Sequence, residues 1–406
     1  MTEAVIVSAV RSPIGRANKG SLREMRGDDL AAQMVRAALD AVPGLDPSTV
    51  EDLMMGCAQP AGEQGYNIAR MVAMQLGLDS VPGTTVHRYC SSSLQTTRMA
   101  FHAIKAGEGD VFISAGVETV SRFGFGKSDG MPDTKNPAFF EAMERTKALA
   151  ADPDARWSDP RQRGELSDIY IAMGDTAENV AQLRGVSRAA QDEWAVRSQN
   201  RAEAAAARGF WAKDITPVTL ADGTVVSTDD GPRAGVSIEK LSMLQPVFRE
   251  HGTVTAANCC PLNDGAAALV IMSDRRAAEL GLTPLARIVS TGVAAMTPEL
   301  MGLGPVDAVR RALDNAKMSI SDIDIMELNE AFAAQVLPSI DDIGIDADKV
   351  NVNGGAIALG HPFGMTGARM TTTAIHALQE RDEQFAVETM CVAGGQGMAL
   401  VLERLS

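Results

Sequence analysis

The sequence predicts an α/β protein built from two similar halves, with a segment of different character inserted between them. Segments near the start of the chain recur in the same order near its end, whereas all three tryptophans lie in the middle. Short apolar runs rich in β-branched residues alternate with stretches of helical periodicity. Repeated units of strand, helix and strand predict two similar α/β halves.

The repeat begins with a strand and a helix in each half. The strand-like AVIVSAV from Ala4 resembles ARIVSTG from Ala286. The helical DLAAQMVRAALDA, ending at Ala41, resembles GPVDAVRRALDNA, ending at Ala316. In a later pair of similar segments, Cys90 aligns with His361, and the helical stretch after Cys90 aligns with the stretch after His361. The offsets, 316 − 41 = 275 and 361 − 90 = 271, differ little, so only small insertions separate the two copies.

These matches divide the chain into three parts. Residues 1–120 together with 255–275 form a first half, residues 121–254 form an insertion, and residues 276–406 form a second half, each half being expected to hold five strands. The insertion has a helical core that starts near Met173 and is expected to stop at Gly209. The apolar run that ends in NDGAAALVIMSD is expected to be the strand that completes the first half.

Composition excludes several classes of protein. The 406 residues carry a formal net charge of −15, which opposes nonspecific binding to nucleic acid. No stretch reaches the roughly 18 apolar residues of a membrane span. The five cysteines are odd in number and scattered, which fits free thiols in a reducing compartment and predicts a cytoplasmic protein with no metal site.

Cys90 and His361 are the first candidates for chemistry, because the repeat places each just ahead of a predicted helix. The positive end of a helix lowers the pKa of a thiol, and packing of the two halves would bring an imidazole to it. This pair would make an activated nucleophile. Taken singly, Cys90 would be read as a small buried residue and His361 as a turn residue; their equivalence in the repeat favours the catalytic interpretation.

A glycine-rich loop supplies a third candidate, Cys391 in CVAGGQG. Glycines allow the backbone to approach closely and leave N–H groups free to donate to an oxyanion. By itself this pattern equally describes a turn and a core cysteine.

The chain resembles the thiolase family of acyl-CoA acetyltransferases and 3-ketoacyl-CoA thiolases. The resemblance covers nearly the whole chain and rests on several ordered motifs: VHRYCSSSLQ, MGDTAENVA, GTVTAANCCPLNDGAAA, MGLGPV, ELNEAFAAQ, NVNGGAIALGHPFGMTGARM and CVAGGQG. It implies the thiolase fold, in which two similar mixed-sheet α/β halves form αβαβα layers and an inserted loop domain covers coenzyme A.

By the resemblance, Cys90 is the nucleophile that carries the acyl group, and His361 takes its proton. Cys391 is the acid and base at the α-carbon of the acetyl-CoA unit. Asn329 holds a water that forms one oxyanion hole with His361, and the backbone N–H groups of Cys90 and Ala393 form the other.

The resemblance also implies contacts with CoA, which is a substrate, so no cofactor is expected. Met173, Met301 and Phe332 would line the acyl and pantetheine end, and Arg233 would lie near the adenine. Cys260 stands where relatives have a serine that contacts CoA.

Some positions depart from the family pattern. Ser93 and Ala393 replace glycines, and Ala172 stands where short-chain members often have histidine. These changes bear on acyl specificity more than on the reaction. The CSS after Cys90 favours a degradative thiolase that cleaves 3-ketoacyl-CoA in fatty-acid or related β-oxidation and acts on acyl-CoA thioesters as a homodimer or homotetramer.

The alternatives are a biosynthetic acetoacetyl-CoA thiolase, a non-catalytic acyl-CoA or sterol-carrier relative, and a subunit that needs a β-oxidation complex partner. Retention of Cys90, His361 and Cys391 argues against the non-catalytic alternative.

Overall fold

The computed structural model describes residues 2–125 and 134–406. The length of the segment 121–168 predicts that it shapes the pocket for the acyl tail, and part of that segment lies outside the described residues. The core is a mixed sheet with the strand order β10-β11-β12-β9-β1-β8-β5-β3-β4. Its strands are β1 (Ala4–Arg11), β3 (Asp52–Gly56), β4 (Gly83–Val86), β5 (Val111–Thr119), β8 (Asn263–Ser273), β9 (Ala286–Ala295), β10 (Ile325–Leu328), β11 (Phe385–Val392) and β12 (Gln396–Arg404). The short β2 (Gly15–Arg16) pairs with β8, and β6 (Val218–Thr219) and β7 (Val225–Val226) form a separate hairpin.

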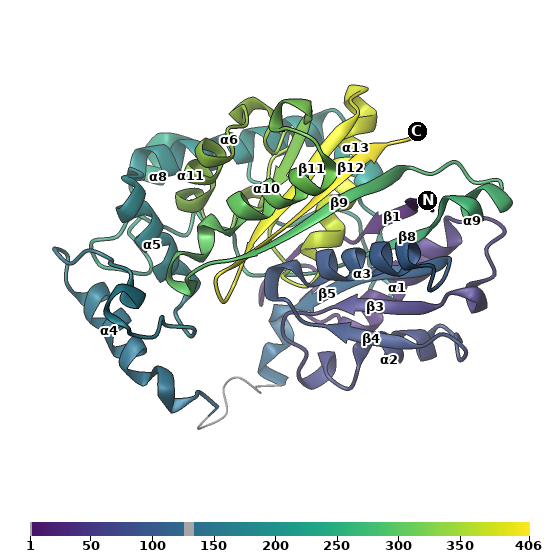
Figure 1. The fold of residues 1–406 in the computed structure, drawn as a ribbon, viewed down its shortest axis with the longest axis horizontal. Coiled ribbons are helices and arrows are strands. Elements are labelled where there is room, and N and C mark those ends of the chain that lie inside the picture. The colour runs from purple at the N-terminus through teal and green to yellow at the C-terminus, as the bar shows by residue number, and fades with distance from the viewer. Residues whose placement is uncertain (1, 126–133) are drawn as a thin grey trace.

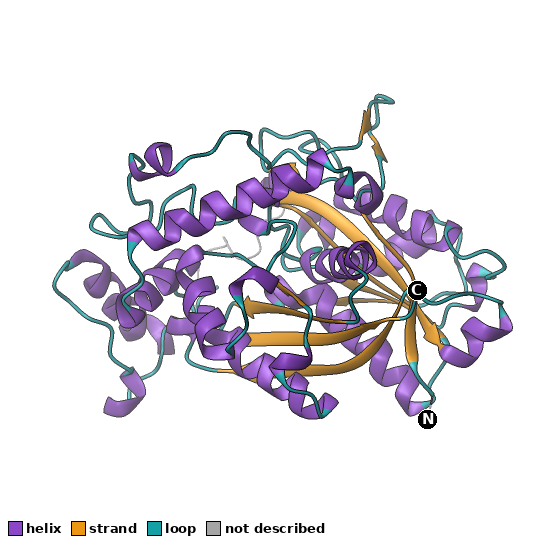
Figure 2. Cartoon of the chain, turned by 90° about the horizontal axis from the view of Figure 1, so that it is seen from above, coloured by secondary structure: helices purple, strands orange, loops and turns teal. Residues whose placement is uncertain are grey.

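Helices lie on both sides of these strands (Figure 2). They are α1 (Gly27–Asp40), α2 (Ile68–Gln75), α3 (Ser92–Ala106), α4 (Phe140–Ala151), α5 (Met173–Arg184), α6 (Arg188–Ala207), α7 (Phe210–Asp214), α8 (Ile238–Ser242), α9 (Asp274–Glu279), α10 (Gly304–Ala316), α11 (Ala333–Ile343), α12 (Ala356–Leu359) and α13 (Thr366–Arg381). Short 3₁₀ turns η3 (Tyr89–Ser91) and η8 (Pro298–Leu303) precede α3 and α10. In the part of the chain that the structure describes, no helix has the length and apolarity to cross a membrane.

The two halves lie side by side in Figure 1, one from purple to blue and the other from green to yellow. They join where β1 pairs antiparallel with β9 through only two residue pairs, Val5 with Arg287 and Ile6 with Ala286. Helices α1 and α10 pack on the outer faces of the two parts of the sheet, whereas α3 and α13 pack on each other between them. This gives the αβαβα layering of the predicted fold class.

The inner helices touch closely because a glycine stands at their contact. A Cβ atom on Gly367 of α13 would lie 2.2 Å from the backbone nitrogen of Leu94 in α3, so only glycine fits there. One residue on, the backbone N–H of Ala368 donates to Ser93 Oγ at 2.9 Å. This contact fixes the starts of both helices, which position the residues expected to react.

Two expectations need correction. The second half has four strands rather than five, because its outermost strand is reduced to a single bridge between Met326 and Val350. The chain cannot continue as a strand there, since the next residue, Asn351, has a left-handed φ of 48°. In addition, α3 and α13 start 366 − 92 = 274 residues apart, so His361 stands five residues before its helix and Cys90 only two.

The inserted segment contributes helices α4 to α8, and α5 and α6 pack on α11 of the second half. Its helical core is two helices, separated at Gly185, which has a left-handed φ of 65°. Gly209, the predicted stop, follows α6 with φ 80°. The predicted strand after the insertion is β8, which begins at Asn263 and lies between β1 and β5.

Candidate active site

Cys90 lies in η3, directly before α3, and is partly exposed. Burial raises the pKa of its thiol to about 12, and hydrogen bonds from the backbone N–H groups of Ala393 and of Cys90 itself oppose this rise. The lowered pKa expected from the helix start is therefore wrong, because desolvation outweighs the helix dipole. The Ala393 N–H reaches the sulfur from the other half of the molecule.

His361 is buried in the segment between α12 and α13, and its ring is held on both sides. Nδ1 lies 2.6 Å from Thr366 Oγ1, and that hydroxyl donates to the carbonyl of Pro362 at 2.7 Å. A hydroxyl has one proton, so Thr366 must accept from Nδ1–H, which leaves the lone pair on Nε2. Burial, and secondarily the charge of Arg369, lowers the pKa of His361 to about 3. The imidazole is thus neutral, with a basic Nε2.

Asn329 follows β10 and lies beside that basic nitrogen. Its Nδ2 is 3.2 Å from His361 Nε2, and its carbonyl accepts a 2.9 Å hydrogen bond from Gln335 Nε2. Asn329 Oδ1 is buried and has no hydrogen-bond partner among the described residues. A buried amide oxygen of this kind is a ready acceptor for a water or a substrate group.

Cys391 is fully buried in β11, opposite Gly397 of β12. Burial raises the pKa of its thiol, and the neighbouring Cys90 adds to this effect, which places the two sulfurs in one electrostatic environment. The loop after it turns through Gly394 and Gly395, with φ of 78° and 75°. Ala393 is not among the residues with positive φ, so its side chain introduces no strain where the family has glycine.

The residues expected to line the acyl and pantetheine end come together. Met301 and Phe332 share one buried cluster with Cys391, and Met173 and Cys260 pack against it. Cys260 is attached there by its N–H, which donates to the carbonyl of Ala331 at 3.0 Å.

Arg233 lies apart from this cluster, exposed on the loop after α7 and β7. It lines a cavity of about 60 Å³ that also contains Arg16 and ends at Pro261, the neighbour of Cys260. Burial, and then the positive charge of Arg16, lowers the pKa of Arg233. Two guanidinium groups thus lie near one another beside the predicted CoA contact.

Family models account for almost the entire chain. The thiolase N-terminal domain matches residues 4–275 and the thiolase C-terminal domain matches residues 282–404. The chain belongs to the thiolase family.

Among curated thiolases, the 3-oxoadipyl-CoA/3-oxo-5,6-dehydrosuberyl-CoA thiolase of Escherichia coli (strain K12) is 44% identical over 100% of both chains. The 3-ketoacyl-CoA thiolase of Bacillus subtilis (strain 168) is 42% identical over 99% of this chain and 100% of its own. Among solved structures, the acetyl-CoA acetyltransferase of Bacillus anthracis has a TM-score of 0.84 at 37% identity, and human mitochondrial 3-ketoacyl-CoA thiolase has 0.85 at 34%. Each alignment covers 100% of this chain and 99% of the other.

Three residues of this thiolase site were missed by sequence reasoning. Thr366 sets the tautomer of His361, and Asn263 Oδ1 accepts the His361 backbone N–H at 3.0 Å. Arg16 joins Arg233 from a segment more than 200 residues away. Thr366, only five residues after His361, could have been considered as its partner, whereas nothing local marks the other two.

No group of three or more potential metal ligands occurs among residues 2–125 and 134–406.

Proposed function

We propose that this protein cleaves 3-ketoacyl-CoA with CoA to give acetyl-CoA and a shortened acyl-CoA, through an acyl group carried on Cys90. The observation that supports this most strongly is the meeting of Cys90 with the Cys391 loop. The Ala393 N–H is directed at the Cys90 sulfur, and the Cys90 thiol adds to the rise in the pKa of Cys391. One thiol can then attack a carbonyl while the other exchanges a proton with the adjacent carbon.

In the first half-reaction, Nε2 of His361 takes the proton of Cys90 as the sulfur attacks the 3-keto carbon. Collapse of the alkoxide leaves a thioester on Cys90 and breaks the bond between the α and β carbons. The departing enolate of acetyl-CoA takes its proton from Cys391. In the second half-reaction, the sulfur of a new CoA attacks the thioester while its thiol proton passes to the Cys391 thiolate. The Cys90 sulfur leaves and takes its proton back from His361.

The Cys90 thiol and the His361 imidazole are both neutral before the reaction, and this determines when the proton moves. A thiol with a pKa of about 12 does not transfer its proton to an imidazole with a pKa of about 3 before the sulfur attacks. The transfer therefore accompanies attack on the substrate, when negative charge moves from sulfur to the keto oxygen. The N–H groups of Cys90 and Ala393 are assigned to that oxygen, which becomes the oxygen of the Cys90 thioester. His361 Nε2 and a water held by Asn329 are assigned to the enolate oxygen of the departing acetyl-CoA unit.

Coenzyme A is assigned to the face formed by the inserted segment, residues 121–254. The two catalytic halves are residues 1–120 plus 255–275 and residues 276–406. Neither Arg16 nor Arg233 forms an ion pair with a carboxylate in the described ranges, although the two line one cavity. Unpaired guanidinium groups bind phosphate strongly. We assign them to the 3′-phosphate of CoA.

Degradative use is favoured by the relatives named for 3-ketoacyl and 3-oxoadipyl substrates. Biosynthetic use is the second candidate, favoured by the likeness to the Bacillus anthracis acetyl-CoA acetyltransferase. The five free thiols fit a cytoplasmic location, and we propose a homodimer or homotetramer.

The test is CoA-dependent cleavage of a series of substrates: acetoacetyl-CoA, unbranched 3-ketoacyl-CoA of six to ten carbons, and 3-oxoadipyl-CoA. Cleavage by the wild type and its loss in Cys90→Ala supports the proposal. A wild-type protein that cleaves none of them contradicts it, and exclusive use of acetoacetyl-CoA favours the biosynthetic candidate.

A further inference from the structure

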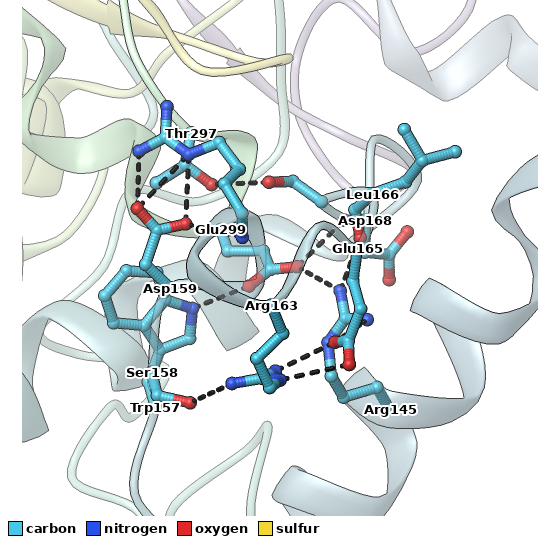
Figure 3. Close-up of polar contacts among 12 residues, drawn as sticks. Arg145, Trp157, Ser158, Asp159, Arg163, Glu165, Leu166, Asp168, Thr297 and Glu299 are labelled. Carbon is cyan, nitrogen blue, oxygen red and sulfur yellow. Dashed lines mark hydrogen bonds and ion pairs between the residues drawn. The ribbon is translucent and has the colours of Figure 1, made fainter.

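Glu299, in η8, is a buried carboxylate that binds three separate parts of the inserted segment (Figure 3). Its side chain is about 4% exposed. Oε2 accepts a 2.6 Å hydrogen bond from Trp157 Nε1. Oε1 accepts from the backbone N–H of Asp168 at 2.8 Å and from Arg145 Nη2 at 3.1 Å. One side chain of the second half thus gathers α4, Trp157 and the segment before α5.

The partners of Glu299 fix the backbone of residues 165–170. Arg145 Nη2 also donates to the carbonyl of Leu166 at 2.7 Å. Thr297, two residues before Glu299, donates to Ser167 Oγ at 3.1 Å. Asp168 is itself buried, and its Oδ1 accepts the N–H of Tyr170 at 2.9 Å. Residue 169 is therefore held on both sides.

Ile169 lies beside the catalytic loop. A Cβ atom placed on Gly394, three residues after Cys391, would be 3.6 Å from Ile169 Cδ1 and 4.0 Å from Tyr89 Cε2. The side chains of Ile169 and Tyr89 thus flank Gly394, and these residues are 37% and 42% exposed. Exposed apolar groups next to a reacting centre form a surface for an apolar substrate group.

The same turn, η8, also carries Met301, which is buried in one cluster with Cys391 and Phe332 at the candidate active site. Glu299 therefore connects the acyl-pocket residues on η8 to the wall that carries Ile169. Its contacts require a carboxylate, because all three partners are N–H donors. A glutamine would direct its own NH₂ group at one of them and lose that contact.

We infer that Glu299 is a positioning residue that holds residues 165–170, and with them Ile169, as one wall of the pocket for the acyl tail. This rests on the proposed function, since it assigns a specificity role within the same site. A two-carbon acyl group ends near Cys90 and does not reach this wall, whereas a longer tail contacts it. Glu299 then acts on the binding of long substrates rather than on the chemical steps.

The test compares wild type with Glu299→Gln on acetoacetyl-CoA and 3-ketooctanoyl-CoA, with thermal unfolding measured in parallel. We expect KM for 3-ketooctanoyl-CoA to rise about tenfold, the scale on which a pocket discriminates a few methylene groups. KM for acetoacetyl-CoA and kcat for both substrates should change less than about twofold. Trp157→Phe, which removes one N–H but keeps the ring, should act in the same direction more weakly. It replaces Glu299→Gln if that variant does not fold.

The matched control is Asp159→Asn, which breaks a more exposed ion pair with Arg161 in the same segment and should leave both KM values unchanged. Equal losses on both substrates, or no change on either, would overturn the inference. A wild type that cleaves acetoacetyl-CoA alone would also overturn it, since no tail would be bound. A wild type that cleaves neither contradicts the proposed function instead.

Discussion

The hydroxyl of Thr366 lies 2.6 Å from Nδ1 of His361 and can only accept there, because its own proton goes to the carbonyl of Pro362. A neutral imidazole has one N–H, so this contact determines that Nε2 is the atom able to take a proton. The role proposed for His361 Nε2 thus depends on the hydroxyl of Thr366.

Thr366→Val should lower kcat/KM for cleavage about tenfold. The substitution leaves a buried Nδ1–H without an acceptor, at a cost of about 1–3 kcal/mol, and the alternative tautomer turns a proton toward Asn329. Thr366→Ser keeps the hydroxyl and is the control. Nitrogen chemical shifts of labelled histidine would report the tautomer directly. Unchanged activity and tautomer in the valine variant would refute the role of Thr366.

Cys90 and Cys391 should be needed for different chemical steps. Cys391→Ala should lose cleavage by a factor of about 10² or more, the scale of a positioned acid or base, yet still exchange acetyl groups between CoA molecules. Cys90→Ala should lose both activities, because it can carry no acyl group. Labelled CoA measures the exchange beside the cleavage assay. If Cys391→Ala lost exchange as completely as cleavage, Cys391 would act in acyl transfer itself.

Alkylation of Cys90 should be faster than that of Cys57 and Cys391, and it should accelerate with pH. Cys90 is partly exposed, whereas Cys57 and Cys391 are buried. A pKa raised to about 12 means that the thiol form persists at neutral pH, so the thiolate fraction and the rate rise about tenfold per unit from pH 7 to 10. Mass spectrometry after brief iodoacetamide treatment measures this, with glutathione as the reference. A plateau below pH 8 would indicate a preformed thiolate.

Arg16→Ala should raise KM for CoA about tenfold, the size expected for one charge-assisted hydrogen bond of about 1.5 kcal/mol. The same variant should use dephospho-CoA, which lacks the 3′-phosphate, as well as the wild type does. Arg36→Ala, an exposed arginine on α1, is the control. An equal rise in KM for CoA and for dephospho-CoA would show that Arg16 does not bind the 3′-phosphate.

Periodicity and the internal repeat were enough to predict two similar α/β halves and an insertion, and the family resemblance supplied the layered fold. They did not predict the loss of the fifth strand in the second half, because that depends on the left-handed turn at Asn351, a single residue within an otherwise matching pattern. The different distances of Cys90 and His361 from the helices that follow them could not be predicted either, because aligned sequences do not show where each helix begins.

The site residues could be located by motif, but their protonation could not. The helix start before Cys90 predicts a low pKa, and only the packed structure shows that burial reverses the direction. Likewise, Glu299 in MTPELMGLGP has no sequence feature that links it to Trp157, Asp168 and Arg145, because these partners are at least 131 residues away along the chain.

The position of β8 between β1 and β5 affects how the protein can be made. β5 ends at Thr119, but its neighbour β8 ends at Ser273, after the whole insertion. At about 5–20 residues per second, a ribosome needs roughly 8–30 s to add the residues between them. During this interval β1 and β5 have unpaired edges open to other chains. A nascent chain of this length is therefore the stage at which we expect aggregation or chaperone capture, before either catalytic half exists.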